Sequence, residues 1–194
     1  MDADGSNFEV FARGVRNSVG FDWDPQYNEI WMTDNGRDFL GDDLPPDELN
    51  HAPVIGLHFG YPYCHGGDLQ DPQFGHLSCQ YFAPPAHNFQ AHSANLGIHF
   101  YNGMSFPEKY RRGAFVAQHG SWNRSTRVGY RLMFLEISDR KVLSAEVFAD
   151  GWLREEDQTR LGRPVDIIEL PDGSLLVTDD QEGLIYRITY HHQE

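Results

Sequence analysis

Three clusters of polar residues follow runs of apolar residues, and their side chains are of types that could bind a planar anionic ligand. The central cluster places His119, Trp122, Asn123 and Arg124 within six residues. An indole and a guanidinium can stack on a planar ring, and cationic groups can pair with an anion. The other two clusters are Thr33-Asp34-Asn35-Gly36-Arg37 and Thr178-Asp179-Asp180. Asp and Asn at strand ends can instead cap turns, and for Asp179 and Asp180 both interpretations stay open.

Two arginines stand at matching places in front of apolar runs, Arg16 before Asn17 and Arg163 before Pro164. Guanidinium groups in equivalent positions would offer bidentate contacts to the carboxylates of a bound ligand. Either arginine could also be a surface charge.

The stretch 34–50 holds six acidic residues among 17, with Gly and Pro to bend its backbone. Carboxylate and main-chain oxygens on a bent loop are the ligands that Ca²⁺ prefers, although the alternating ligand spacing of an EF-hand is missing. A solvated acidic loop is the alternative interpretation.

Zinc, serine-hydrolase and dinucleotide chemistry lack support, because the His-Glu-x-x-His, Cys-x-x-Cys, Gly-x-Ser-x-Gly and Gly-x-Gly-x-x-Gly patterns do not occur.

Short β-rich runs separated by Gly and Pro predict that strands position these clusters. The expected strands span residues 19–23, 29–34, 96–101, 114–118, 130–137, 144–148, 165–169, 174–178 and 183–189. No stretch of 12 or more residues keeps helical spacing of apolar residues without a Gly or Pro. The sequence therefore predicts an all-β fold.

A repeated order of strand, proline-containing turn, strand and polar end indicates a β-propeller, whose blades bury their faces against neighbouring blades. The turn prolines are Pro25, Pro107 and Pro171, which predicts about three blades, too few to close a ring. We expect one partial propeller domain over residues 1–194, with a long loop insertion at 36–95. Equivalent strand ends lie on one face of a propeller, so the polar clusters should converge there and form a site.

Composition limits the partners and the location of the protein. Its 194 residues include 15 Lys and Arg against 29 Asp and Glu, and this net charge of −14 argues against nucleic acid and anionic membrane surfaces. No run approaches the ~20 apolar residues of a membrane helix.

Cys64 and Cys79 could form a disulfide or remain unrelated thiols in a reducing cytosol. We expect the disulfide, and hence a periplasmic or secreted protein, although the first residues lack the features of a leader.

Several motifs are long enough to compare with known proteins. They are Phe11-Ala-Arg-Gly-Val-Arg-Asn-Ser-Val-Gly20, Thr33-Asp-Asn-Gly-Arg-Asp38, Gly41-Asp-Asp-Leu-Pro-Pro-Asp-Glu-Leu-Asn50 and Phe59-Gly-Tyr-Pro-Tyr-Cys64. They resemble the glucose/sorbosone dehydrogenase family, and segments 119–124, 162–166 and 171–180 are similar to its sorbosone dehydrogenase branch. The resemblance implies a six-bladed propeller that uses pyrroloquinoline quinone (PQQ) and Ca²⁺ to oxidise a sugar or sugar aldehyde and passes electrons to an acceptor.

The resemblance also implies roles for individual residues. The family's Arg-Asn pair that contacts the quinone falls on Arg16 and Asn17, and its main-chain carbonyl ligands of Ca²⁺ fall on Gly36 and Arg37. Further cofactor contacts fall on His119, Trp122, Asn123, Arg124 and Arg163.

The family's catalytic base is a histidine upstream of the Arg-Asn motif, and only 15 residues precede Arg16 in this chain. The resemblance therefore implies a C-terminal half whose propeller is completed by N-terminal blades outside this chain. Two other interpretations remain. One is a non-catalytic propeller-type module that binds carbohydrate or protein, and the other is a lactonase-like hydrolase in which Asp34, Asn35 and Asp179 would hold a metal.

Overall fold

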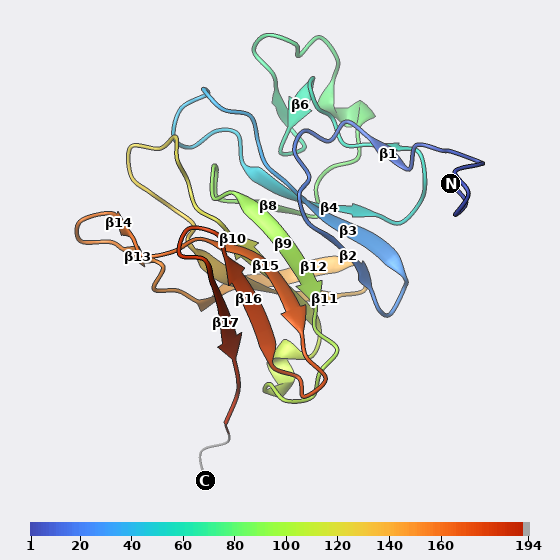
Figure 1. Cartoon of the computed structure of the whole chain (residues 1–194). Helices are drawn as coiled ribbons and strands as arrows, with labels where there is room; N and C mark the ends of the chain where they lie inside the picture. Colours follow the sequence, from blue (N-terminus) through green and yellow to red (C-terminus); the bar gives the residue numbers. More distant parts are fainter. Residues whose placement is uncertain (192–194) are drawn as a thin grey trace.

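The chain folds into β-sheets joined by turns and loops, as its short apolar runs predict (Figure 1). The computed structural model describes residues 1–191. Three sheets of three or four strands lie next to one another and form three consecutive blades. Within residues 1–191, no helix is long and apolar enough to cross a membrane.

The first blade is an antiparallel sheet in the order β2-β3-β4-β8. Its strands are β2 (Phe21–Asp24), β3 (Glu29–Asp34), β4 (Asp47–Ala52) and β8 (His87–Phe89). The Asp24 carboxylate accepts the Gln26 N–H at 2.7 Å and thereby fixes the turn between β2 and β3. Between β4 and β8 the chain leaves the sheet for an excursion over residues 53–86, then pairs with β4 again.

The second blade has the order β9-β10-β11-β12, and the third has the order β15-β16-β17. The second consists of β9 (Asn95–Phe100), β10 (Gly113–Gln118), β11 (Arg131–Ser138) and β12 (Lys141–Ala149). The third consists of β15 (Pro164–Glu169), β16 (Leu175–Asp179) and β17 (Leu184–Ile188).

Shorter elements decorate the blades. The strand β1 pairs in parallel with β5, and β6 with β7 and β13 with β14 form antiparallel pairs. Their bounds are β1 (Ala12–Arg13), β5 (Leu57–His58), β6 (Cys64–His65), β7 (Leu69–Gln70), β13 (Leu153–Arg154) and β14 (Thr159–Arg160). Two 3-10 helices are η1 (Cys79–Tyr81) and η2 (Glu108–Tyr110).

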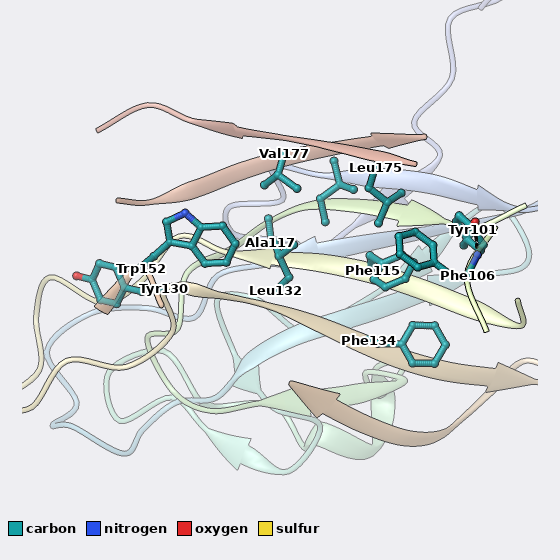
Figure 2. Packing of buried hydrophobic residues seen from close by; sticks show 11 residues of the cluster. Tyr101, Phe106, Phe115, Ala117, Tyr130, Leu132, Phe134, Trp152, Leu175 and Val177 are labelled. Atoms are coloured by element: carbon teal, nitrogen blue, oxygen red, sulfur yellow. Dashed lines mark hydrogen bonds between the residues drawn. The ribbon is translucent and has the colours of Figure 1, made fainter. Parts of the chain in front are cut away.

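The core lies between the blades, and the strand β10 shows how the sequence builds it. Every residue of β10 is buried, because successive side chains of a strand point to opposite faces and this sheet is covered on both. Ala114 and Val116 pack towards the first blade with Trp31. Phe115 and Ala117 pack towards the third blade in the cluster of Figure 2, which also contains Leu132, Phe134, Trp152, Leu175 and Val177. Each blade thus depends on its neighbours for burial.

Glycines allow the first strands of the three blades to approach one another. A Cβ atom at Gly20 would collide with the carbonyl oxygen of Leu96, and a Cβ atom at Gly97 would collide with the side chain of Asp166. Only glycine fits at such close approaches of one backbone to another. A glycine is therefore present both where the chain at β2 approaches β9 and where β9 approaches β15.

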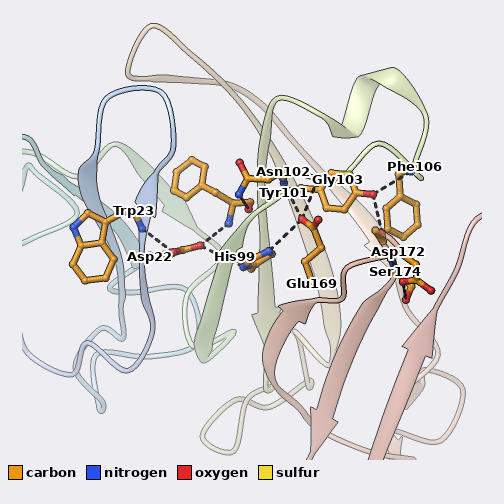
Figure 3. Close-up of polar contacts among 12 residues, drawn as sticks. Asp22, Trp23, His99, Tyr101, Asn102, Gly103, Phe106, Glu169, Asp172 and Ser174 are labelled. Atoms are coloured by element: carbon orange, nitrogen blue, oxygen red, sulfur yellow. Dashed lines mark hydrogen bonds and ion pairs between the residues drawn. The ribbon is translucent and has the colours of Figure 1, made fainter.

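A polar seam crosses these first strands (Figure 3). His99 of β9 lies between Asp22 of β2 and Glu169 of β15, with Nδ1 3.4 Å from Asp22 and Nε2 3.6 Å from Glu169. Backbone N–H groups hold both carboxylates, since Phe100 donates to Asp22 at 2.8 Å and Asn102 donates to Glu169 at 2.8 Å. One imidazole thus joins three blades.

All nine strands predicted from the sequence are present, each displaced by three residues or fewer at either end. The prediction of a loop insertion over 36–95 is wrong in extent, because β4 and β8 of the first blade lie inside it. The cause is the composition of β4, Asp-Glu-Leu-Asn-His-Ala, in which buried positions are polar. Such a strand carries no apolar alternation.

Candidate functional site

Carboxylates at the ends of the second strands hold the segments that lead into the first strands. Asp34 accepts the backbone N–H of Arg16 at 2.9 Å and that of Asn17 at 2.6 Å. In the third blade, Asp179 accepts the backbone N–H of Arg163 at 3.0 Å. Burial raises the pKa of Asp34 above its ordinary value, although these hydrogen bonds oppose the shift. Asp179 also accepts the backbone N–H groups of Gln181 at 3.0 Å and Glu182 at 3.1 Å, so the turn-capping interpretation is confirmed for Asp179. Asp34 shares with it the role of holding the segment before the first strand.

Neighbouring threonines repeat the arrangement. Thr33 accepts the backbone N–H of Gly20 at 3.2 Å, and Thr178 accepts that of Asp166 at 3.0 Å. The first and third blades each contain such a Thr-Asp pair, which we call the clip of that blade. The clip fixes where the backbone before the first strand runs, so it positions Arg16 and Arg163 at equivalent places in two blades.

A cavity of about 170 Å³ lies between loops of the first and second blades. The first blade contributes one wall and the second blade the other. Its lining is Arg16, Asn17, Asn35, Gly36, Asp38, Asp47, His92, Ala94, Trp122 and Asn123. The structure thus brings together five residues that the sequence predicts, namely Arg16, Asn17, Gly36, Trp122 and Asn123.

The Arg16 guanidinium is fixed at the cavity wall. Its Nη2 lies 3.1 Å from Asp38 Oδ2, and its Nη1 donates to the carbonyl of Asn35 at 3.2 Å. Asp38 also accepts a hydrogen bond from Asn123 Nδ2 at 2.6 Å, so one carboxylate connects the two blades. The Oδ1 atom of Asn35 is buried and has no hydrogen-bond partner within residues 1–191. A buried acceptor without a partner is costly in a folded protein, so it marks a place for a donor or a cation.

Asp47 organises the floor of the cavity. It accepts the backbone N–H groups of Gly36 at 2.9 Å and Ala94 at 2.8 Å. Ser93 also donates to it through its hydroxyl at 3.2 Å. Burial raises the pKa of Asp47 above its ordinary value. These contacts hold the loops of both blades at the cavity in one arrangement.

Aromatic rings are exposed at the rim. Trp122 is 66% exposed and Phe39 is 83% exposed, and their ring centroids lie 6.3 Å apart in an edge-to-face arrangement. Large exposed rings beside a polar cavity are available to stack on a planar ligand.

The side chain of Arg37 turns away from the cavity towards the excursion. Its Nη1 lies 2.6 Å from Asp71 Oδ2, and the same carboxylate accepts His65 Nε2 at 2.9 Å. Although burial raises the pKa of Asp71, these two partners dominate and hold it well below its usual range. Of Gly36 and Arg37, only the main-chain oxygens therefore remain as candidate ligands. Among the described residues, His, Cys, Asp and Glu form no cluster of three that could hold a metal.

Besides Arg37, three predicted cofactor contacts lie outside the cavity lining, namely His119, Arg124 and Arg163. Arg163 donates to the carbonyls of His119 at 3.0 Å and Gly120 at 2.6 Å, and it tucks against the ring of Tyr130. His119 Nε2 pairs with Asp180 at 2.8 Å, and burial lowers the pKa of this imidazole. The two residues thus sit where the second and third blades meet.

Arg124 joins the second blade to the acidic loop of the first. Its guanidinium donates to the Asp42 carbonyl and lies 3.1 Å from the Asp43 carboxylate. Only 9% of the side chain is exposed. Protein groups therefore occupy its donors, and its role as a cofactor contact stays a prediction.

The predicted disulfide is present. Cys64 and Cys79 are bonded within the excursion, where Tyr63 and Phe82 stack with their ring centroids 5.9 Å apart. The bond and this aromatic pair give the excursion a small core of its own.

Sequence inspection misses Asp38, Asp47 and His92 as individual site residues. Asp38 and Asp47 lie in the acidic stretch that suggests calcium, but their partners come from distant segments. His92 belongs to no motif. A pattern shows neighbours in sequence, whereas this cavity is assembled across two blades.

Comparisons with known proteins identify the family and the fold of the chain. The TrAA12-like family matches residues 68–191. An uncharacterized protein of Borreliella burgdorferi is 46% identical over 186 residues, which cover 94% of this chain and 49% of that protein. The chain thus spans about half the length of this relative.

Three solved structures share the fold. A Trichoderma reesei protein of carbohydrate-active enzyme family AA12, solved with iodide, has a TM-score of 0.79 and is 24% identical. The match covers 91% of this chain and 53% of that protein. The PQQ domain of pyranose dehydrogenase from Coprinopsis cinerea has a TM-score of 0.74 and is 21% identical. That match covers 92% of this chain and 55% of the domain. The soluble aldose sugar dehydrogenase of Escherichia coli has a TM-score of 0.66 and is 19% identical. That match covers 97% of this chain and 50% of the enzyme. The predicted fold class, an all-β partial propeller of the six-bladed type with about three blades, is confirmed.

Proposed function

Because this chain belongs to the TrAA12-like family, we propose that it is an oxidoreductase domain that binds PQQ with Ca²⁺ and takes part in oxidising a sugar or sugar aldehyde. The observation that carries the proposal is the cavity in which Arg16 and Asn17 of one blade face Trp122 and Asn123 of the next. The finer assignment, to the sorbosone dehydrogenase branch, rests on the sequence motifs alone.

The residues at the cavity fit an anionic, planar cofactor. Arg16 supplies a cation that two protein oxygens already orient, and Trp122 supplies an exposed indole. The buried, unpartnered Oδ1 of Asn35 supplies an acceptor that a bound group or ion would satisfy. Such a set matches carboxylates on a ring system better than it matches an apolar ligand.

The fit to Ca²⁺ depends on main-chain oxygens. Among residues 1–191 no hydrogen bond is donated to the carbonyls of Gly36 and Arg37, and Asp47 fixes this loop through the Gly36 N–H. Carbonyl oxygens on a rigid loop are suitable ligands for this hard cation. When bound, the quinone supplies a two-electron acceptor, and Ca²⁺ polarises its carbonyl as a Lewis acid.

The proposal assigns the proton-accepting histidine to further blades of the same propeller, since the chain spans about half the length of its relative. The substrate and the electron acceptor would then be bound jointly by those blades and this chain. The disulfide between Cys64 and Cys79 supports a location outside the reducing cytosol, in the periplasm or secreted.

The lactonase-like interpretation has little support, because the carboxylates it needs are already used. Both oxygens of Asp34 accept backbone N–H groups. Asp179 accepts Arg163 N through Oδ1 and the Tyr186 hydroxyl through Oδ2, at 3.0 and 3.1 Å. Recruiting either residue to a metal would break the clip of its blade.

The test is a titration of the purified chain with PQQ, with and without Ca²⁺, followed by quenching of tryptophan fluorescence and by quinone absorbance. We expect saturable binding that requires Ca²⁺ and that weakens at least tenfold in Arg16→Gln. Thr126→Val, on the exposed loop beyond Arg124, is the matched control and should bind as the unaltered chain does. A folded chain that takes up no quinone would contradict the proposal and favour the non-catalytic module that binds carbohydrate or protein.

A further inference from the structure

His92 occupies an unusual position at the cavity. Its backbone is in the left-handed region, with φ of 65°, and only 6% of the residue is exposed. Its Nε2 lies 2.9 Å from the carbonyl oxygen of Gly41 and 3.1 Å from that of Leu44. Its Nδ1 lies 3.3 Å from Asn123 Nδ2. The ring therefore bridges the acidic loop of the first blade and the central cluster of the second.

These contacts decide where the hydrogens are. A carbonyl oxygen can only accept, so Nε2 carries the hydrogen, and in a neutral imidazole Nδ1 is then an acceptor. Asn123 Nδ2 consequently has acceptors on two sides, Nδ1 of His92 and Oδ1 of Asp38. Both of its N–H groups are used. The Oδ1 atom of Asn123 accepts no hydrogen bond within residues 1–191, and Asn123 is one of the residues that line the cavity.

We infer that Asp38 and His92 are positioning residues, and that they hold the Asn123 carboxamide with its oxygen offered to a hydroxyl group of the sugar substrate. An oxygen acceptor repels a carboxylate and attracts a hydroxyl. Asn123 therefore faces the sugar, whereas the carboxylates of the quinone would pair with the guanidinium group of Arg16. The inference rests on the proposed function, and it revises the role that the sequence suggests for Asn123.

Two substitutions of His92 separate its contacts. His92→Gln keeps an N–H near the Nε2 position for the carbonyls of Gly41 and Leu44, but it removes the acceptor that faces Asn123. His92→Asn keeps an acceptor near the Nδ1 position and removes the contact to these carbonyls. Asn tolerates the left-handed backbone at this position at least as well as His does. Thr126→Val is again the matched control.

Three measurements test the inference in the full chain. The Kd for PQQ comes from tryptophan quenching, and the Kd for D-glucose comes from calorimetry on the quinone-loaded chain. We expect His92→Gln to weaken glucose binding about five- to tenfold, as for one lost hydrogen bond, with the quinone Kd changed less than twofold. His92→Asn should restore glucose binding to within about twofold. Equal weakening of both ligands, or no weakening of either, would overturn the inference, and so would quinone uptake without glucose binding.

The third measurement does not depend on any ligand. In the ¹⁵N NMR spectrum of the unliganded chain, the two side-chain N–H signals of Asn123 should shift in His92→Gln and stay unchanged in Thr126→Val. Unchanged Asn123 signals in His92→Gln would overturn the positioning role. If the unaltered chain binds no quinone while the Asn123 signals shift as expected, the proposed function fails and the positioning network stands.

Discussion

Glu48 is a carboxyl group held in an environment that favours its neutral form. Only 7% of the residue is exposed, and burial raises its pKa from 4.5 to about 7. Its partners are the Gly66 N–H at 2.6 Å and Asn50 Nδ2 at 3.1 Å, while Asn50 Oδ1 is buried without a partner. A protonated Glu48 could donate to that oxygen if the Asn50 amide were turned by 180°.

This environment predicts a pH dependence of stability. Between pH 4.5 and about 7 the folded chain keeps a proton that the unfolded chain releases, so the free energy of unfolding falls as pH rises through this window. The loss is at most about 3 kcal/mol by the pKa difference. Urea unfolding at pH 5 and pH 8 measures it. Glu48→Gln should flatten the dependence, and the exposed Glu9→Gln should not. Equal slopes in all three proteins would contradict the assignment.

The environment of His99 predicts a second pH dependence of the free energy of unfolding, in a higher pH range. Although burial lowers its pKa, the ion pairs with Asp22 and Glu169 dominate and raise it above the ordinary value of 6.5. Its stabilising contribution is therefore full below pH 6.5 and is lost as pH rises through the raised pKa. We expect His99→Gln to cost on the order of 1 kcal/mol at pH 6 and less at pH 9, measured by urea unfolding. His76→Gln, on the exposed side of the excursion, is the control, and a loss that grows with pH would refute this account.

Residue types alone indicate part of the candidate site. Arg16, Asn17, Trp122 and Asn123 are recognisable from the sequence because each belongs to a motif, and the structure brings all four to one cavity. Whether Arg124 reaches a ligand is not visible in a motif, since Asp42 and Asp43, its partners, lie about 80 positions away. His92 is missed for the same reason. A motif gives chemistry, and the contacts between blades decide which atoms remain free.

At the scale of elements, strand positions follow from composition wherever burial is apolar. The strand β10, Gly-Ala-Phe-Val-Ala-Gln, is buried on both faces and is evident as a continuous apolar run. The strand β4 is almost as buried but polar, because Asp47 and Glu48 bind backbone N–H groups of the surrounding loops and Asn50 binds Glu48. Hydrophobic periodicity does not reveal a strand whose side chains are held by hydrogen bonds. That is why the insertion over 36–95 is predicted too long.

The excursion over 53–86 should be stabilised locally by its disulfide. A closed loop of this size contributes roughly 3 kcal/mol in the chain-entropy account, and Cys64 and Cys79 both lie within the excursion. We expect the double substitution Cys64→Ser and Cys79→Ser to speed amide hydrogen exchange in residues 57–85 while β10 and β11 keep their protection. Mass spectrometry after proteolysis measures this. Uniform acceleration over the whole chain would show instead that the disulfide stabilises all blades together.

At the scale of the whole molecule, both outer blades expose apolar side chains. On β2, Phe21 is 57% exposed and Trp23 is 48% exposed. On the third blade, Ile168 is 59% exposed and Ile185 is 67% exposed. Patches of this kind are typical of surfaces that bind another protein segment. They agree with the proposal that further blades adjoin this chain.

These faces predict association of the isolated chain. We expect its sedimentation coefficient to rise with concentration, because apolar surface gains by burial. The double substitution Phe21→Ser and Trp23→Thr should reduce the rise without lowering the melting temperature, whereas Leu143→Ser, at an exposed position of the outer strand β12, should leave it unchanged. A sedimentation coefficient independent of concentration would contradict this prediction.

The pairing of β4 with β8 has a consequence for the evolution and engineering of this protein. Leu49 pairs with His87 and Asp47 with Phe89, so the chain that leaves the first blade returns beside the point of departure. Closing a longer loop between two such fixed ends adds little entropy cost. The segment between Ala52 and His87 can therefore change in length while the sheet keeps its register, provided that the contacts of Gly66 with Glu48 and of Asp71 with Arg37 are kept. Diversity among homologues, and foreign sequences grafted by design, should be tolerated best at this junction.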